Sequence, residues 1–286
     1  SAIWLELVKI QRKTRLMAVL QENVPENLLT HTEGLILHIL EDRPGCNVRE
    51  LAELLQLERS WVSRIVTSLQ EAKLLRAFVP EADKRSKKLR LSPSAGEALR
   101  RLNAFRACIM DKLLTPLSKS EYRELCDLSK VLADGLQAPA HLAIRGAHPL
   151  DIEFARISWA VGVLGDDFMH SGLNVTQYQV LYAMSVIENR DVFAVDLFAI
   201  LPFDMSTISR TLAAFASLGL IDRKKLTQDK RALALHLSEK GRALWEKCMR
   251  MADATVGQAL REIPEVQAKR LLALLTQTSG EILRRP

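Results

Sequence analysis

The stretch ADKRSKKLRLS at residues 82–92 returns in altered form as QDKRALALHLS at residues 228–238. Sliding the chain against itself at an offset of 146 aligns 60–92 with 206–238 without a gap, and 10 of those 33 positions are identical. The same offset places Thr30 on Thr176. A repeat this long exceeds a solenoid unit, so each copy is expected to be a domain with its own core.

The length of 286 residues suits two domains of about 100–150 residues each. Between the copies, the segment DGLQAPAHLAIRGAHP at 134–149 is punctuated by glycine and proline and lacks helical periodicity. We therefore predict a first domain at 1–138, a linker at 139–149 and a second domain at 150–286.

Composition describes a soluble, folded protein, because 48% of the residues are hydrophobic and only 12 are glycine and 10 proline. A formal charge of +6 favours an anionic partner if the charge is concentrated locally. The four cysteines show no C-x-x-C spacing, which favours reduced thiols and a cytoplasmic protein. The uncharged run at 168–187 is interrupted by polar side chains, so we expect no membrane partner.

Each copy contains the pattern of a winged helix-turn-helix. In the first copy, NVRELAELLQL at 47–57 and ERSWVSRIVTSLQEAKLL at 58–75 predict two amphipathic helices joined by a very short turn. LLRAFV and KKLRLS, at 74–79 and 87–92, then predict the two strands of a wing. The second copy repeats this order, so we predict a mainly α fold with small β-wings and two winged modules in tandem.

The order S-x-x-S-R in a helix, then D-K-R, then L-x-L-S followed by glycine resembles the MarR family of winged helix-turn-helix regulators. The resemblance implies a repressor of transcription that binds double-stranded DNA and is released by a small anionic aromatic ligand. It also implies symmetric dimers with interlocked terminal helices. A fused tandem would supply both modules as a monomeric pseudo-dimer, and higher assembly stays open.

Two departures from the family pattern concern the first wing. Lys73 stands where the second copy has Gly219, and a left-handed residue with a side chain costs on the order of 1 kcal/mol there. An extra residue is also expected between Ser92 and Gly96.

The local charge supports DNA binding independently of the resemblance. Residues 58–90 hold nine basic and four acidic side chains, a net charge of +5, and residues 204–237 hold six and three, a net charge of +3. Such clustering on a helix and wing is typical of a phosphate-binding surface. We therefore expect the first module to bind the DNA backbone more strongly.

The candidate DNA contacts lie on the second helix and the wing of each copy. Trp61 could instead serve packing, and Arg64 and Arg210 could simply support their helices. The resemblance implies that Asp83 and Asp229 orient the wing arginines. The predicted contacts are Ser60, Trp61, Ser63, Arg64, Lys84, Arg85, Lys87, Ser206, Thr207, Ser209, Arg210, Lys230 and Arg231.

Other functions find less support in the sequence. There is no phosphate-binding loop, dinucleotide fingerprint or nucleophile elbow, so we predict neither an enzyme nor a cofactor. His31 and His38 are interpreted as structural rather than metal-binding, because no further ligands accompany them. Cys46 has Arg43 and Arg49 nearby, which would lower a thiol pKa, but an ordinary thiol is favoured.

A winged-helix scaffold that binds proteins rather than DNA remains an alternative, since TLAAFASLGL at 211–220 carries no charge. The ligand-binding residues are unknown from sequence. Aromatic and basic side chains that could line a cleft are Trp4, Arg12, His31, Trp159, Tyr178 and Tyr182.

Overall fold

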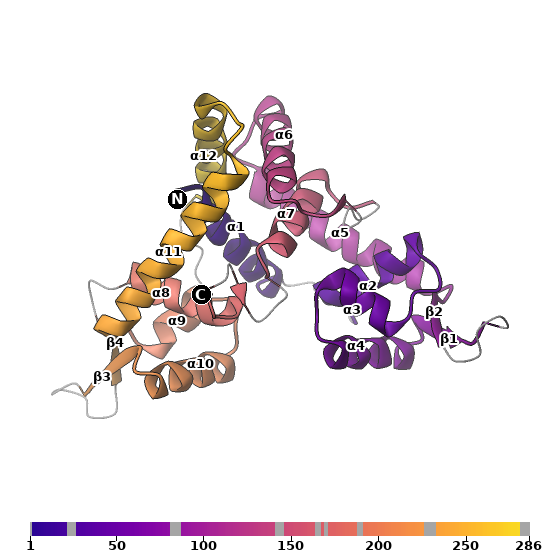
Figure 1. The fold of residues 1–286 in the computed structure, drawn as a ribbon, viewed down its shortest axis with the longest axis horizontal. Coiled ribbons are helices and arrows are strands. Elements are labelled where there is room, and N and C mark those ends of the chain that lie inside the picture. The colour runs from indigo at the N-terminus through magenta and orange to yellow at the C-terminus, as the bar shows by residue number, and fades with distance from the viewer. Residues whose placement is uncertain are drawn as a thin grey trace. The chain divides into compact units, whose positions relative to one another are not determined.

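The structure, a computed structural model, describes residues 2–21, 27–80, 87–140, 146–163, 167–168, 171–187, 191–225 and 233–280. The predicted wing-tip residues lie outside the described residues: Asp83, Lys84, Arg85, Asp229, Lys230 and Arg231. Within the described ranges the fold is helical with two small antiparallel sheets (Figure 1). The helices are α1 (Ala2–Val19), α2 (His31–Asp42), α3 (Val48–Leu55), α4 (Arg59–Glu71), α5 (Ala95–Leu114), α6 (Lys119–Gly135), α7 (Pro149–Ala160), α8 (Val175–Val186), α9 (Ala194–Ile200), α10 (Met205–Ser217), α11 (Glu239–Ala259) and α12 (Glu265–Ser279). The strands are β1 (Leu75–Phe78), β2 (Lys88–Leu91), β3 (Ile221–Lys225) and β4 (Leu233–Leu237).

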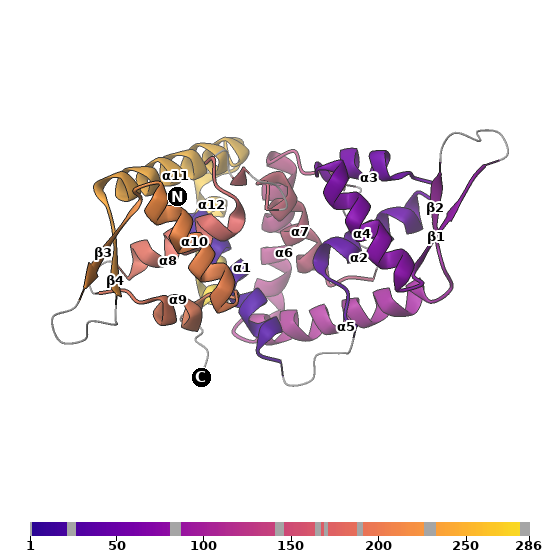
Figure 2. The same ribbon diagram turned by 90° about the horizontal axis from the view of Figure 1, so that it is seen from below.

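Winged module 1 consists of α2, α3, α4, β1 and β2, as the sequence predicts. Only three residues separate α3 from α4, and Val62, Val66 and Leu69 turn the buried face of α4 toward the module core. The strands pair antiparallel from Leu75 opposite Leu91 to Phe78 opposite Lys88. Figure 2 shows the two strands extending away from the helices of this module.

Winged module 2 consists of α8, α9, α10, β3 and β4. Its strands pair antiparallel from Ile221 opposite Leu237 to Lys225 opposite Leu233, and an isolated bridge joins Val192 to Leu235. Module 1 repeats this bridge, because Leu89 donates its amide to the Cys46 carbonyl at 3.0 Å. The two modules therefore share their wing architecture, including the bridging segment that precedes α3 in module 1 and α9 in module 2.

Capping hydrogen bonds correct the repeat register in the first helix of each module. Thr30 forms a capping box with Glu33 at the start of α2, and Asn174 forms the same box with Gln177 at the start of α8. These residues are 144 apart, so the alignment of Thr30 with Thr176 is wrong by two positions. The physical reason is a longer connection between α8 and α9 than between α2 and α3.

The extra residue expected after Ser92 is a second error. Ser118 precedes α6 and Pro264 precedes α12, and each follows its wing serine, Ser92 or Ser238, by the same interval. Without an insertion, Ala95 takes the position of Gly241. A Cβ at Gly241 would lie 2.1 Å from the Leu220 carbonyl oxygen, whereas fully buried Ala95 carries one. The backbone of module 1 therefore leaves more room at this point.

The described chain divides into two compact units that exchange their first helices. The "α1 unit" comprises 1–21, 113–128 and 161–286, and the "α7 unit" comprises 22–112 and 129–160. Helix α1 of the first copy thus lies with module 2, and α7 of the second copy lies with module 1. The boundaries predicted from the repeat, 1–138 and 150–286, stay a prediction.

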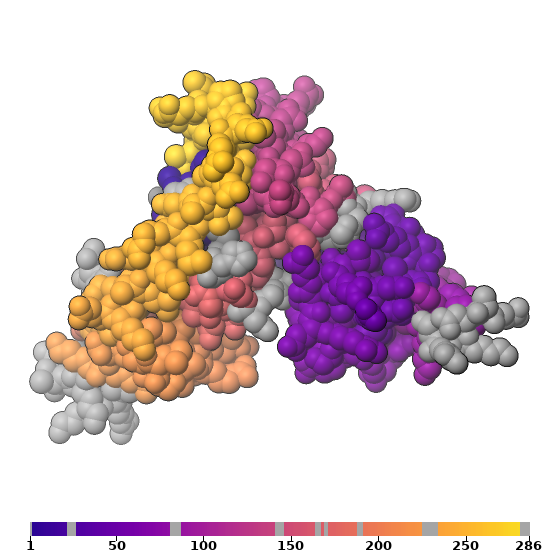
Figure 3. Space-filling model, viewed as in Figure 1, coloured from indigo at the N-terminus to yellow at the C-terminus, as the bar shows by residue number. Residues whose placement is uncertain are grey.

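Specific contacts hold each exchanged helix in its unit. In the α1 unit, Lys13 Nζ donates to the Ser279 carbonyl at the end of α12 at 2.9 Å, and Trp4 Nε1 donates to the Tyr178 hydroxyl at 2.8 Å. In the α7 unit, Arg106 on α5 binds both carboxylate oxygens of Asp151 on α7, at 2.6 and 2.7 Å. Figure 3 shows the outer surface of both modules from the side seen in Figure 1.

The exchange includes the hairpin between α5 and α6. In the α1 unit, Gln277 on α12 donates to the Pro116 carbonyl at 2.8 Å, and Arg270 on α12 pairs with Glu124 on α6 at 2.8 Å. Segments of the first copy are therefore integral to the unit that holds module 2. None of the helices that the structure describes is long and apolar enough to cross a membrane.

Candidate nucleic-acid interface and ligand pocket

Helix α4 presents the polar face predicted for DNA contact. Ser60, Ser63 and Arg64 are exposed, while Trp61 is half-buried at the edge of this face. Glu58 is the N-cap residue of α4. Its side chain accepts no hydrogen bond from the backbone amides of this helix, whose residues are all described. The first amides of α4 therefore remain available to an outside acceptor such as a phosphate.

Helix α10 carries the equivalent residues, but a side chain caps its start and its arginine bonds to the helix itself. Asp204 accepts from the Thr207 amide at 2.7 Å and from the Ser206 and Thr207 hydroxyls at 2.6 and 3.1 Å. These bonds, the Ser206 hydroxyl first, lower the pKa of Asp204 to about 2. Exposed Arg210 lies against its own helix, 3.4 Å from the Ser206 carbonyl and 3.3 Å from the Thr207 hydroxyl. The carboxylate of Asp204 thus caps the start of α10.

The serines and arginines predicted for DNA contact therefore share one exposed helix face in each module. Ser209 is exposed on α10, and Thr207 is half-buried. On the wings, Lys87 is exposed, and the other predicted basic residues lie outside the described part of the chain.

The wing strands carry two cations that count toward the local charge of +5 but were not among the predicted contacts. Arg76 and Arg90 stand opposite each other in the β1–β2 ladder, and both are exposed. The guanidinium of Arg90 lies 5.4 Å from the centre of the Phe78 ring, which holds it near the strand. The alternation of leucine and basic residues in KKLRLS was the available signal, because it places Arg90 on the face opposite Leu89.

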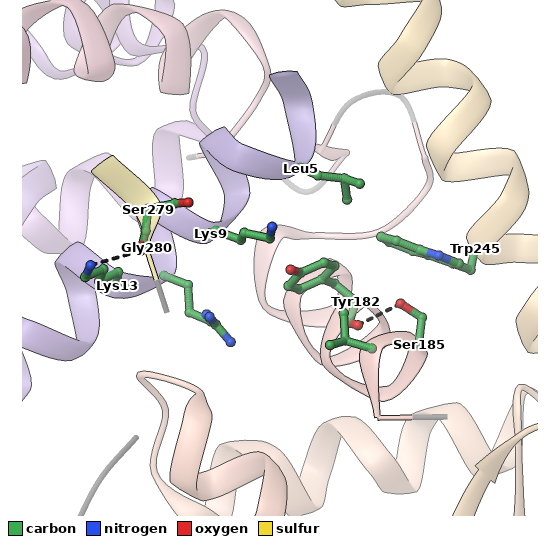
Figure 4. Close-up of a pocket in the computed structure, with 10 residues that line it drawn as sticks. Leu5, Lys9, Lys13, Tyr182, Ser185, Trp245, Ser279 and Gly280 are labelled. Atoms are coloured by element: carbon green, nitrogen blue, oxygen red, sulfur yellow. Dashed lines mark hydrogen bonds between the residues drawn. The ribbon is translucent and has the colours of Figure 1, made fainter. Parts of the chain in front are cut away.

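The α1 unit contains a pocket of ≈ 930 Å³, a size typical of ligand sites. Its walls come from α1, α8, α11 and the end of α12, and Figure 4 shows Lys9, Tyr182 and Trp245 around it. The residues that line the pocket include Lys9, Arg12, Lys13, Tyr182, Ser185 and Trp245. Three cations thus meet two aromatic rings.

Arg12 distinguishes this pocket from an ordinary basic groove. Its exposed fraction is 3%, and it makes no hydrogen bond or ion pair with any residue that the structure describes. Burial lowers the pKa of its guanidinium, against a smaller opposing effect of Tyr182. A buried guanidinium without an anion is costly, and a bound carboxylate would relieve that cost through paired hydrogen bonds.

The neighbouring lysines are better satisfied. Lys9 pairs with Glu6 at 2.7 Å, and Glu6 also accepts from the Ser279 hydroxyl. Lys13 donates to the carbonyl of Ser279, and burial lowers the pKa of its ammonium group. Among the three cations, Arg12 is therefore the one prepared to receive a ligand anion.

Aromatic side chains pack beside the pocket. The Tyr178 ring contacts Trp245 edge-on with centroids 5.6 Å apart, and Trp4 and Phe168 pack against the same tyrosine. Burial raises the pKa of Tyr178 and of Tyr182, so both hydroxyls remain neutral at physiological pH. Flat apolar faces beside a cation suit an aromatic anion.

The sequence identified only part of this pocket. Arg12 and Tyr182 line it and Trp4 and Tyr178 support it, but His31 and Trp159 belong to the α7 unit. The sequence analysis missed Lys9, Lys13 and Trp245. The spacing of Lys9, Arg12 and Lys13, which places them on one side of α1, was the signal for the two lysines.

The histidines considered for metal binding and the cysteine considered for thiol reactivity lie beside charged side chains of the protein. His31 Nδ1 lies 2.7 Å from an Arg106 nitrogen, and His38 Nδ1 lies 3.5 Å from Glu41. No group of three or more metal-binding side chains occurs among the described residues. Burial raises the pKa of the Cys46 thiol and Glu50 adds to the effect, so together they outweigh the lowering by Arg43.

Comparison with known families finds one match, in winged module 1. Residues 29–87 match the model of the MarR family. This segment, which includes α2, α3, α4 and β1 of winged module 1, is thereby similar to the MarR family of transcription regulators. No curated protein sequence matches the chain.

Similar solved structures include the PcaV transcriptional regulator from Streptomyces coelicolor in complex with its natural ligand, 27% identical over 43% of this chain and 88% of that chain, with a TM-score of 0.35. The YusO protein from Bacillus subtilis is 23% identical over 44% and 85%, with a TM-score of 0.37. CouR from Rhodococcus jostii, bound to p-coumaroyl-CoA, is 21% identical over 46% and 91%, with a TM-score of 0.36.

Proposed function

We propose that this chain is a DNA-binding repressor in which one polypeptide supplies both reading modules as a pseudo-dimer, each module belonging to one copy of the repeat. A small anionic aromatic ligand that binds in the pocket of the α1 unit releases the DNA. The contacts are those of α4, α10 and the two wings. The observation that carries the proposal is the exchange of α1 and α7 between units that each hold one winged module.

The exchange supports a pseudo-dimer because interlocked terminal helices require both copies to fold together. Dimeric helix-turn-helix proteins place two recognition helices in successive major grooves about 34 Å apart. The exposed serines and arginines of α4 and α10 suit base edges and phosphates, respectively. The free amides of α4 and the carboxylate-capped start of α10 favour module 1 as the stronger DNA binder.

Footprinting of the intact chain on DNA that flanks its own coding region tests the proposal. We expect two protected half-sites about one helical turn apart, with protection weakened by added phenolic acids. Absence of any protected site at low salt would contradict DNA binding. Protection of a single half-site would contradict the two-module arrangement.

Cleavage between the copies tests the pseudo-dimer separately. A protease site introduced near Gly146 cuts the predicted linker. We expect the two fragments to co-elute in size-exclusion chromatography, because each unit needs a helix from the other copy. Elution as two separate folded monomers would refute the pseudo-dimer while leaving the winged modules intact.

A scaffold role for module 2 is the second candidate. It is favoured by the low charge of α10, whose Arg210 bonds to its own helix, and by exposed apolar side chains at Met205 and Leu218. The Arg64→Ala and Arg210→Ala variants distinguish the two roles. If only Arg64→Ala affects DNA binding, module 2 serves another surface.

A further inference from the structure

The pocket of the α1 unit has a counterpart position in the α7 unit, which the repeat defines. The capping boxes at Thr30 and Asn174 set an offset of 144 between α2 and α8. His38, Glu41 and Asp42 therefore take the places of Tyr182, Ser185 and Val186. Positions that carry an aromatic ring and two uncharged side chains in one unit thus carry a histidine and two exposed carboxylates in the other.

The exchanged helices differ in charge in the same sense. Helix α1 carries Glu6 with Lys9, Arg12, Lys13 and Arg15, a net charge of +3. Helix α7 carries Asp151 and Glu153 with Arg156, a net charge of −1. The helix that supplies every pocket cation to the α1 unit thus has an acidic counterpart.

The one cation of α7 is already satisfied by its own unit. Arg156 donates to Asp134 at 2.5 Å, to Glu153 at 2.7 Å and to the Ala138 carbonyl at 2.9 Å. The offset of 146 between α6 and α12 places Asp134 where the α1 unit has Gly280. An internal carboxylate therefore lies against the only cation of α7, whereas Arg12 of α1 has no such partner among the described residues.

We propose that the chain binds one anionic aromatic effector, in the α1 unit, and that the counterpart position in the α7 unit excludes anions. This inference rests on the proposed effector response and adds its stoichiometry. Glu41 and Asp42 repel a carboxylate and Asp134 already holds the cation of α7, while Arg12 attracts a carboxylate in a buried setting where charge interactions are strong. Effector binding is accordingly 1:1 per chain and hyperbolic, without cooperativity between equivalent sites.

The location also determines which module the effector contacts. The pocket is lined by Tyr182 and Ser185 of α8, the first helix of module 2, and by α1, α11 and α12. A ligand there bridges module 2 to the exchanged helix from the first copy. Effector binding therefore acts directly on module 2 alone.

Isothermal titration calorimetry with 2-naphthoate tests the stoichiometry on the intact chain. We expect one site per chain and at least about a tenfold loss of affinity in Arg12→Gln, because a charge-assisted pair is removed. The half-exposed Lys9→Gln should lose less, and it remains informative if Arg12→Gln fails to fold. Arg15→Gln is the matched control, since Arg15 is on the same helix but does not line the pocket.

Two equivalent sites per chain, unchanged affinity in both Arg12→Gln and Lys9→Gln, or no binding at all would overturn the inference. DNA binding by the same preparations, measured by gel shift without naphthoate, separates this failure from failure of the proposed function. Retained DNA binding with no naphthoate site would refute the effector site alone. Loss of DNA binding in the unmodified chain would refute the proposed function itself.

Discussion

Lys73 and Gly219 hold the same left-handed backbone position at the ends of α4 and α10, with φ angles of 60° and 68°. Ser92 donates its hydroxyl to the Lys73 carbonyl at 2.6 Å, and Ser238 donates to the Gly219 carbonyl at 2.7 Å. The wing serine thus fixes the ends of α4 and α10 in the same way. One module meets this geometry with glycine, and the other accepts a strained lysine.

The first prediction follows from that pair. Lys73→Gly should raise the free energy of unfolding by about 1 kcal/mol, because glycine adopts positive φ without steric cost. Gly219→Ala should lower it by a similar amount, since a Cβ there meets no described atom within 4 Å and only the backbone cost remains. Urea denaturation followed by circular dichroism measures both. A loss of stability in Lys73→Gly would show that the lysine side chain has a stabilising contact.

The second prediction concerns the tight approach in module 2. Gly241→Ala should destabilise the protein by about 1–3 kcal/mol, because its Cβ would lie 2.1 Å from the Leu220 carbonyl oxygen. The converse variant, Ala95→Gly, should lose only the burial of one methyl group, about 1 kcal/mol. Thermal melting compares them. Equal tolerance of alanine and glycine at both positions would show that the two wings are joined to their following helices alike.

The third prediction tests the proposed DNA contact by α4 and α10. Arg64→Ala should weaken DNA binding by about 1–3 kcal/mol if the side chain reads a base, or reduce the salt slope by about 1 if it binds a phosphate. Arg210→Ala should cost less, because Arg210 must first release its contacts with Ser206 and Thr207. Fluorescence anisotropy at several salt concentrations gives both quantities.

Arg101→Ala is the control for that measurement, since it removes an exposed arginine that pairs with Glu97 on α5. A similar loss in the control would mean that net charge, rather than the helix face, determines affinity. Arg85→Ala and Arg231→Ala extend the test to the wings. The local charges of +5 and +3 predict the larger loss for Arg85→Ala.

The fourth prediction is a pH dependence at the start of α10. The pKa of Asp204 is lowered to about 2 in the folded protein, so its contribution to stability is present above the ordinary value of 3.8 and is lost as the pH falls toward 2. Asp204→Asn should lower the melting temperature at pH 7, and the difference should shrink below pH 3. A constant difference across that range would assign the effect to packing rather than to charge.

The fifth prediction concerns the operator. Module 1 presents Ser60, Trp61 and Ser63 where module 2 presents Ser206, Thr207 and Ser209, so the two half-sites should differ and form an imperfect palindrome. Selection from a random DNA library measures the sequence. Trp61→Thr should shift the preference of the first half-site toward the second. A perfect palindrome in the unmodified protein would contradict unequal reading.

Local sequence patterns were sufficient to predict the winged modules. The spacing of Val62, Val66 and Leu69 defines a helix face, and the alternation of Leu89 and Leu91 with basic residues defines a strand. Both signals act over a few residues, so neither depends on the rest of the chain. The register of α8 was missed because the repeat was extended across a connection that is longer in the second copy.

The pocket and the helix exchange could not be read in this way. Arg12 and Tyr182 meet only because α1 folds into the unit of module 2, and no periodicity links positions so far apart in sequence. The partner of Arg106, Asp151, lies across the copy boundary for the same reason. The sequence contains the residues of these pairs but does not indicate that a helix of one copy packs against helices of the other.

The exchange of α1 and α7 also bears on how the two copies diverge. Two free polypeptides of this kind would form like pairs as readily as unlike ones, and a substitution in either would have to suit both. A covalent link keeps the first copy beside the second at an effective concentration in the millimolar range. Each copy always meets its unlike partner, so one half can gain a cationic cavity and the other an internal ion pair without an intermediate in which both change. In the proposed pseudo-dimer, the covalent link thereby removes the requirement that the two halves stay identical.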